Sequence, residues 1–101
     1  MKLRFEKNII SDPVLFIKRC GYGEYYDRRM KKVSYMRRAR GSDMFPRFHV
    51  YIMEHGEDVV FDLHLDQKRP SYAGSSMHAG EYEGTAVEKE AERIRSFLQK
   101  P

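Results

Sequence analysis

The chain has 101 residues, so we expect one domain spanning residues 1–101. Apolar residues make up 41% of it and charged residues 34%, which is typical of a globular protein and argues against a disordered one. The net charge is +4. No apolar run reaches membrane-spanning length, no signal-peptide core is present, and a single cysteine excludes an internal disulfide, so we expect a cytoplasmic protein that binds no membrane.

The charge is unevenly distributed along the chain. Residues 1–50 hold 13 Lys or Arg against 5 Asp or Glu, whereas residues 51–101 hold 6 against 10. The first half therefore carries a charge of +8 and the second half −4. A basic first half favours polyanionic partners.

The first elements are a short strand and a short helix. Residues 2–6 alternate, with Leu3 and Phe5 on one side, as in a strand. Asp12 and Pro13 are typical of a helix start, because the carboxylate caps free N–H groups and proline needs no donor at the first position. The helix is expected to end at Gly21 and to bury Cys20 as an inert thiol.

The rest of the chain is expected to form three strands and a final helix. Residues 32–38 alternate as a strand, and residues 47–66 form a hairpin that turns at residues 54–58. Residues 22–32 fit no element clearly, and residues 39–46 and 68–84 have loop composition. A capping box, Thr85 with Glu88, begins a helix with a stripe of apolar residues, namely Val87, Ala91, Ile94 and Leu98.

These elements predict an α+β fold. We expect a mostly antiparallel sheet of about four strands, with a short N-terminal helix and a longer C-terminal helix packed on one face. The apolar face of the hairpin would meet the final helix. Its polar face would look to solvent, to the 68–84 loop or to a partner.

The polar face of the hairpin is the first candidate site. A two-residue loop would place His49 opposite Asp62, and a four-residue loop would place His49 opposite His64. Either register gathers imidazoles and carboxylates that suit a divalent ion such as zinc or manganese. The candidate metal ligands are His49, Asp62, His64, Asp66 and His78. The candidate catalytic residues are His64, Asp66 and Lys68, as base, orienting acid and anion-binding cation.

The basic segment of residues 28–40 is the second candidate site, because it contains seven cations and no acid. Tyrosines beside and within it could stack on bases while the cations hold phosphates, as in proteins that bind single-stranded nucleic acid or RNA. The residues predicted to bind are Arg28, Arg29, Lys31, Lys32, Tyr35, Arg37, Arg38 and Arg40.

Three functions therefore remain open. The first is a small nucleic-acid-binding domain that uses the basic segment. The second is a metal-dependent phosphodiesterase or nuclease-like hydrolase with its site on the 47–66 hairpin. The third is a non-catalytic interaction module, for example a homodimer that pairs through an exposed strand edge. A solvated polar face and a solvated basic strand are the alternatives to any site at all.

Overall fold

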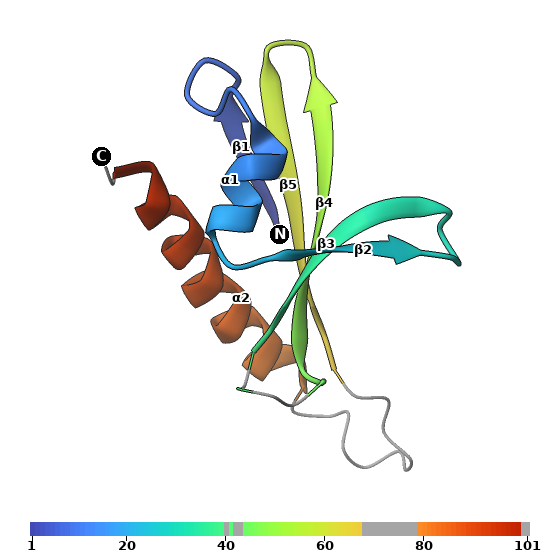
Figure 1. The fold of residues 1–101 in the computed structure, drawn as a ribbon. Helices are drawn as coiled ribbons and strands as arrows, with labels where there is room; N and C mark the ends of the chain where they lie inside the picture. The colour runs from blue at the N-terminus through green and yellow to red at the C-terminus, as the bar shows by residue number, and fades with distance from the viewer. Residues whose placement is uncertain (40, 42–43, 68–78, 100–101) are drawn as a thin grey trace.

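Five antiparallel strands form one sheet in the order β1-β5-β4-β3-β2 (Figure 1). The computed structural model describes residues 1–39, 41, 44–67 and 79–99. In chain order the elements are β1 (Lys2–Glu6), α1 (Pro13–Arg19), β2 (Gly23–Asp27), β3 (Lys32–Arg38), β4 (Arg47–His55), β5 (Asp58–Asp66), α2 (Ala79–Ser96) and the short 3-10 turn η2 (Phe97–Gln99). The α+β prediction is confirmed, but the expected count of four strands omitted β2.

The hairpin of β4 and β5 adopts the second of the two registers that the sequence allowed. His49 lies opposite His64, and Tyr51 lies opposite Asp62. The turn is shorter than the four residues expected for that register, because His55 and Asp58 also pair. Gly56 occupies the turn with a φ of 60°, a left-handed conformation that a residue with a Cβ adopts only under strain.

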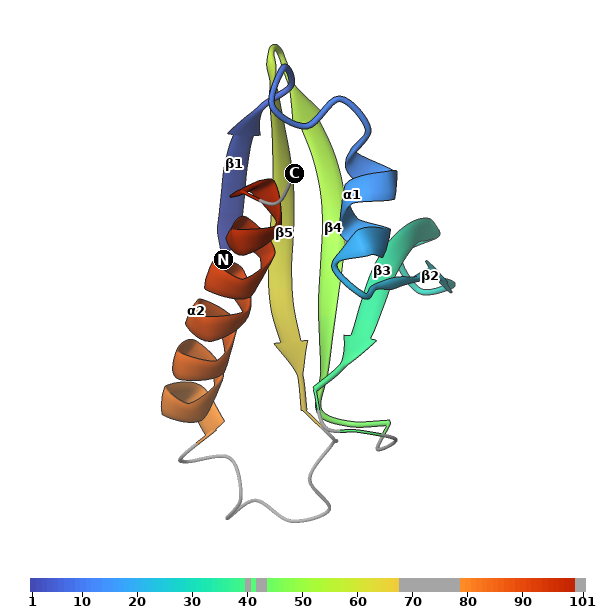
Figure 2. The same ribbon diagram turned by 60° about the vertical axis from the view of Figure 1, so that its left-hand side comes forward.

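Both helices cover the same face of the sheet (Figures 1 and 2). At the start of α1 the Asp12 carboxylate accepts the N–H of Leu15, as the capping pattern predicted. Helix α2 begins at Ala79, six residues before the predicted start at Thr85, so the expectation of a loop through residue 84 is wrong for residues 79–84. Among the described residues, no helix has both the length and the apolar character needed to cross a membrane.

The core lies between this face and the two helices. It joins Ile17 of α1 and Ala91 and Ile94 of α2 to inward-facing residues of β1, β3, β4 and β5, and Cys20 is buried as expected. Burial raises the pKa of the Cys20 thiol to about 11, which makes it a poor nucleophile.

A buried carboxylate also ties the helices to the sheet. Glu90 of α2 is only 4% exposed. It accepts hydrogen bonds from the Tyr22 hydroxyl at 2.6 Å, from Arg93 at 2.8 Å and from Arg37 of β3 at 3.4 Å. Tyr22 lies in the short connection between α1 and β2, so the Glu90 side chain links this connection to α2 and β3.

The hairpin of β2 and β3 leaves the plane of the sheet. Strand β3 pairs with β4 only from Tyr35 to Arg38, whereas its first residues pair with β2 alone. The free end of the hairpin projects from the side of the sheet in Figure 1. This departure from the sheet creates the candidate site on the face that carries no helix.

Candidate functional site

The β2–β3 hairpin bends over the helix-free face of β4. The Tyr51 hydroxyl donates to Asp27 at 3.0 Å, and the Lys32 ammonium lies 4.4 Å from the centre of the Tyr51 ring. The ring centres of Tyr25 and His49 lie 5.8 Å apart in an edge-on arrangement. The polar hairpin face that we expected to meet solvent, the 68–84 loop or a partner is therefore partly covered by β2 and β3.

His49 is buried beneath this cover and is only 6% exposed. Its Nδ1 atom lies 2.9 Å from Asp66, and its Nε2 atom lies 2.7 Å from the Ser34 hydroxyl. The Tyr25 carbonyl, 3.3 Å from the Ser34 hydroxyl oxygen, is a second acceptor to which the single hydroxyl proton can turn. Three strands, β3, β4 and β5, thus contribute one side chain each to a continuous Ser34–His49–Asp66 chain of hydrogen bonds.

This chain has the atom order of a Ser-His-Asp catalytic triad, but Ser34 is fully buried. A substrate therefore cannot reach its hydroxyl in this conformation. The chain accommodates either form of the imidazole: neutral His49 accepts from Ser34, and protonated His49 donates to Ser34 while the hydroxyl turns to the Tyr25 carbonyl. The hydrogen bond from His49, with the charge of Arg47, holds the pKa of Asp66 below its ordinary value.

A second imidazole–carboxylate pair lies nearby on β5. His64 is about half exposed, and its Nε2 atom lies 3.2 Å from Asp62. Within the described part of the chain, no three His, Cys, Asp or Glu side chains converge as a metal site would require. The predicted ligand His78 and the predicted catalytic Lys68 lie outside the described residues.

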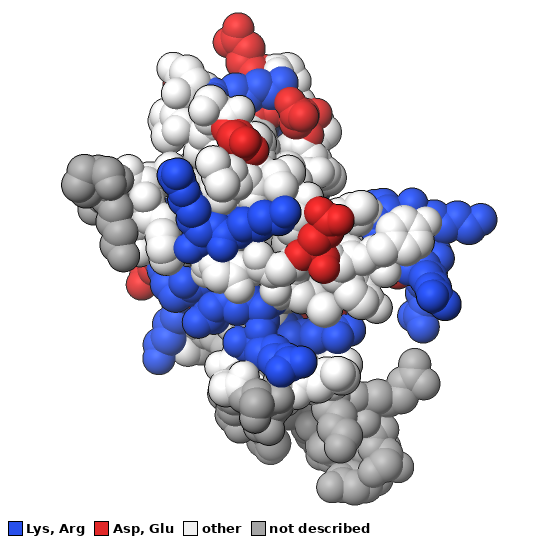
Figure 3. Space-filling view, viewed as in Figure 1, with Lys and Arg blue, Asp and Glu red and all other residues white. Residues whose placement is uncertain are grey.

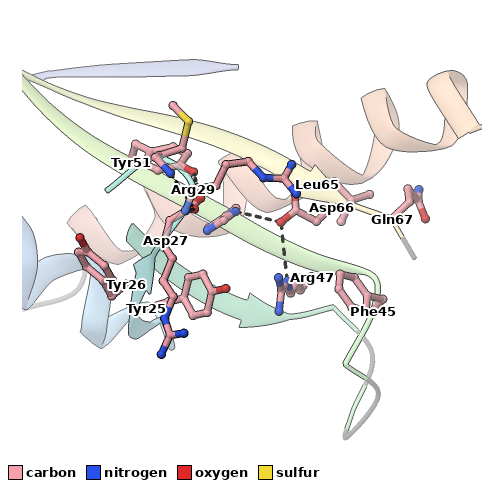
Figure 4. Close-up of a pocket in the computed structure, with 13 residues that line it drawn as sticks. Tyr25, Tyr26, Asp27, Arg29, Phe45, Arg47, Tyr51, Leu65, Asp66 and Gln67 are labelled. Carbon is pink, nitrogen blue, oxygen red and sulfur yellow. Dashed lines mark hydrogen bonds and ion pairs between the residues drawn. The ribbon is translucent and has the colours of Figure 1, made fainter. Parts of the chain in front are cut away.

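A hollow of about 960 Å³ opens beside His49, between the β2–β3 hairpin and the ends of β4 and β5 (Figure 4). Its wall carries the rings of Tyr25, Phe45 and Tyr51. Arginines contribute the positive charge, and the lining includes Arg28, Arg29 and Arg47. Asp27 and Asp66 are the two carboxylates in the lining.

Asp27 fixes the turn that carries the basic residues. One carboxylate oxygen accepts the N–H groups of Arg29 and Met30 at 2.9 and 3.1 Å, and the other accepts the Tyr51 hydroxyl. The Met30 N–H, followed by the Tyr51 hydroxyl and the Arg29 N–H, lowers the pKa of Asp27. Burial and the Asp27 hydrogen bond raise the pKa of Tyr51 to about 12, so Tyr51 keeps its proton.

The predicted nucleic-acid-binding residues separate into two groups. Arg28, Arg29, Lys31 and Lys32 are exposed around the hairpin turn, and Arg38 is exposed at the far end of β3. Lys and Arg side chains gather over this hairpin and in a second band across the middle of the molecule (Figure 3).

Of the described members of the predicted set, only Arg28 and Arg29 line the hollow. Tyr35 is 7% exposed and belongs to the core, and Arg37 turns to Glu90 on the helix-covered face. Arg40 lies outside the described residues.

Several residues of the site were not predicted. Ser34 and Asp27 come from strands whose approach to β4 depends on how the β2–β3 hairpin bends, and no local pattern encodes this bend. Phe45 lies in a stretch of loop composition. The sequence did carry a signal that Tyr51 belongs to the site, because Tyr51 alternates on the same side of its strand as His49.

Protein-family models, curated proteins and solved structures all give no significant match to this chain.

Proposed function

We propose that the protein binds single-stranded nucleic acid or RNA in the hollow beneath the β2–β3 hairpin. The observation that carries this proposal is the combination of aromatic rings and arginines in one open hollow, with further cations on the adjoining turn. Cations attract phosphates regardless of sequence, and aromatic rings offer stacking surfaces for unpaired bases.

The distribution of ion pairs supports this proposal. Within the described residues, Arg28, Arg29 and Lys31 make no ion pair, whereas other arginines such as Arg4 and Arg93 do. The two carboxylates of the hollow are occupied, Asp27 by the turn and Tyr51, and Asp66 by His49. The cations of the turn thus remain available for phosphates.

The shape of the surface favours a single strand over a duplex. Reading a duplex commonly requires a helix presented to the major groove. Here α2 packs its apolar stripe on the sheet, and the rings of Tyr25, Phe45 and Tyr51 line a hollow instead. Aromatic rings recognise unpaired bases, which are free to turn out of the strand, whereas the bases of a duplex are already stacked and paired.

Fluorescence anisotropy with a labelled 12-nucleotide RNA at low salt tests this proposal. We expect binding by the natural protein and a loss of about tenfold or more in affinity for the double variant Arg28→Ala/Arg29→Ala. The matched control is Lys89→Ala/Arg95→Ala, which removes the same charge from exposed positions on α2. Absence of binding to RNA and DNA single strands, or an equal loss in both variants, would refute the proposal.

A metal-dependent phosphodiesterase is the second candidate, favoured by two imidazole–carboxylate pairs of β4 and β5. His49 with Asp66 lines the hollow, whereas His64 with Asp62 lies outside its lining. An ion such as zinc or manganese held there would polarise a phosphoryl oxygen. Melting temperatures measured with zinc, manganese and magnesium test this candidate, since an ion that binds the folded state stabilises it. No shift with any of the three ions counts against it.

The third function, a non-catalytic interaction module, stays a prediction. Strand β2 is an edge of the sheet, and Tyr26 and Val33, which pair across the hairpin, are 55% and 43% exposed. Light scattering that shows a monomer at high protein concentration would contradict a homodimer formed through this edge.

A further inference from the structure

Arg47, which the sequence did not single out as a binding residue, holds an unusual position in the hollow. Its side chain is 18% exposed. The guanidinium lies 4.4 Å from the centre of the Phe45 ring and 5.5 Å from that of Tyr25. These rings limit the conformations of the guanidinium and replace part of its water shell.

The guanidinium of Arg47 is incompletely satisfied. Its Nε atom is buried and has no hydrogen-bond partner among the described residues. The nearest carboxylate oxygen, on Asp66, lies 3.7 Å away, which is too far for a hydrogen bond. The same oxygen accepts from His49 Nδ1 at 2.9 Å, and Figure 4 shows both contacts of Asp66. His49 therefore positions Asp66, and the Nε atom of Arg47 has no hydrogen-bond acceptor among the described residues.

We infer that Arg47 forms the floor of a phosphate subsite in the hollow, which takes the phosphate of one nucleotide. This inference rests on the proposed function and deepens it, because it assigns a defined place to one nucleotide of the strand. The buried Nε atom lies beside Asp66, so a phosphate would bind through the terminal nitrogens of the guanidinium and add the acceptors that Asp66 does not supply. The flat guanidinium fork also matches two phosphate oxygens at once.

The residues around Arg47 favour the binding of a nucleotide over that of other anions. Arg28 and Arg29 line the same hollow and supply further charge for a dianion. The rings of Tyr25 and Phe45 flank the guanidinium, so a ligand with a phosphate and an attached planar base can contact both. Inorganic phosphate lacks the base, and an uncharged nucleoside lacks the phosphate, so each should bind more weakly than the nucleotide.

Titration of the full chain with uridine monophosphate, uridine and inorganic phosphate, followed by NMR shifts of backbone amides, tests the inference. We expect uridine monophosphate to bind at least about tenfold more tightly than uridine or phosphate, with shifts around residues 25–29 and 45–49. Arg47→Ala should remove this preference. Arg47→Lys, which keeps the charge and loses the planar fork, should lose most of it.

The control variant is Arg4→Ala, which removes an arginine from β1 at the opposite edge of the sheet and should bind like the natural protein. Amide spectra of each variant show whether it is folded, and Arg47→Lys keeps the test valid if Arg47→Ala unfolds. Equal binding of uridine and its monophosphate, or unchanged nucleotide binding by a folded Arg47→Lys, would overturn the inference. If RNA binds but the mononucleotide does not, the subsite fails and the proposed function survives; if neither binds, both fail.

Discussion

Both ring nitrogens of His49 have partners from other strands, Asp66 on one side and Ser34 on the other. A histidine on the polar side of a hairpin is ordinarily half exposed, yet the β2–β3 hairpin buries this one. Buried polar groups of this kind stabilise a fold only while every member of the chain keeps its partner. The Ser34–His49–Asp66 chain is therefore sensitive to the loss of any one of its hydrogen bonds.

Replacement of Ser34 by alanine tests this sensitivity. The change leaves His49 Nε2 buried without a partner, so we expect the free energy of unfolding to fall by about 1–3 kcal/mol. Urea denaturation followed by circular dichroism measures the difference. Ser11→Ala is the control, because Ser11 is exposed, and should change stability by less than about 0.5 kcal/mol. Equal stability of Ser34→Ala and the natural protein would contradict this role.

The dependence of the free energy of unfolding on pH tests whether the charge of Asp66 stabilises the fold. The hydrogen bond from His49 and the charge of Arg47 lower the pKa of Asp66 in the folded protein from the ordinary value of 3.8. The unfolded chain thus takes up this proton at a higher pH than the folded chain does. The stabilisation is complete above the ordinary pKa and is lost as the pH falls through the lowered one.

Asp66→Asn removes the titrating group. We expect this variant to be less stable than the natural protein at neutral pH, and the difference to shrink as the pH falls below the ordinary carboxyl pKa. Urea denaturation at a series of pH values measures both curves. A stability difference that stays constant down to the acid limit would show that Asp66 does not act through its charge.

At the scale of elements, α2 is held to the rest of the fold by a buried carboxylate as well as by its apolar stripe. Glu90→Ala removes the acceptor shared by Tyr22, Arg37 and Arg93. We expect the free energy of unfolding to fall by about 2–4 kcal/mol. This is less than for a fully buried ion pair, because the side chains of Arg37 and Arg93 are about one third exposed. Glu92→Ala, at an exposed position on the same helix, is the control and should be nearly neutral in urea denaturation.

Gly84 lies within α2 although its residue type suggested a loop. A Cβ at this position would meet no atom within 4 Å. Gly84→Ala should therefore stabilise the protein by about 0.5–1 kcal/mol, because alanine loses less backbone entropy in a helix. Gly56→Ala is the contrasting variant. Gly56 has a φ of 60°, which strains any residue with a Cβ, so this substitution should destabilise the protein. Thermal melting distinguishes the two, and a destabilised Gly84→Ala would contradict a helix at this residue.

The sequence predicted those elements whose patterns are local. The alternation of β1, β3, β4 and β5 and the Asp12–Pro13 start of α1 are all local signals, and the structure confirms them. Strand β2 was missed because its residues, GEYYD, show no apolar alternation and become a strand only by pairing with β3. The early start of α2 was missed because Gly80 and Gly84 resemble loop residues.

The site was only partly predictable for a related reason. The pairing of His49 with Asp66 was within reach, because both lie on the polar side of a hairpin whose register the sequence narrowed to two. The contacts of Ser34 with His49 and of Asp27 with Tyr51 were not, because they depend on β3 leaving β4 after only four paired residues. The position of Arg47 beside Tyr25 depends on the same bend.

At the scale of the whole molecule, the uneven charge of the chain becomes an uneven surface. The basic first half supplies both the projecting β2–β3 hairpin and the arginine at the start of β4. The acids of the second half are partly used inside the fold, as Glu90 and Asp66 show. The cations around the hollow consequently outnumber the acids that could neutralise them, so a polyanion should be attracted to this side of the molecule.

If the protein binds RNA as proposed, the salt dependence of binding measures how many phosphates this surface contacts. Arg28, Arg29, Lys31 and Arg47 provide cations for about three to four phosphates, and each contributes about −0.7 to the slope of log affinity against log salt for a single strand. We expect a slope of about −2 to −3 in fluorescence anisotropy between low and physiological salt. Arg28→Ala/Arg29→Ala should make the slope shallower by about 1.4, whereas Lys89→Ala/Arg95→Ala on α2 should leave it unchanged. A slope near zero would mean that the strand is not held by its phosphates, and an equal change in both variants would mean that net charge, rather than this hairpin, attracts the strand.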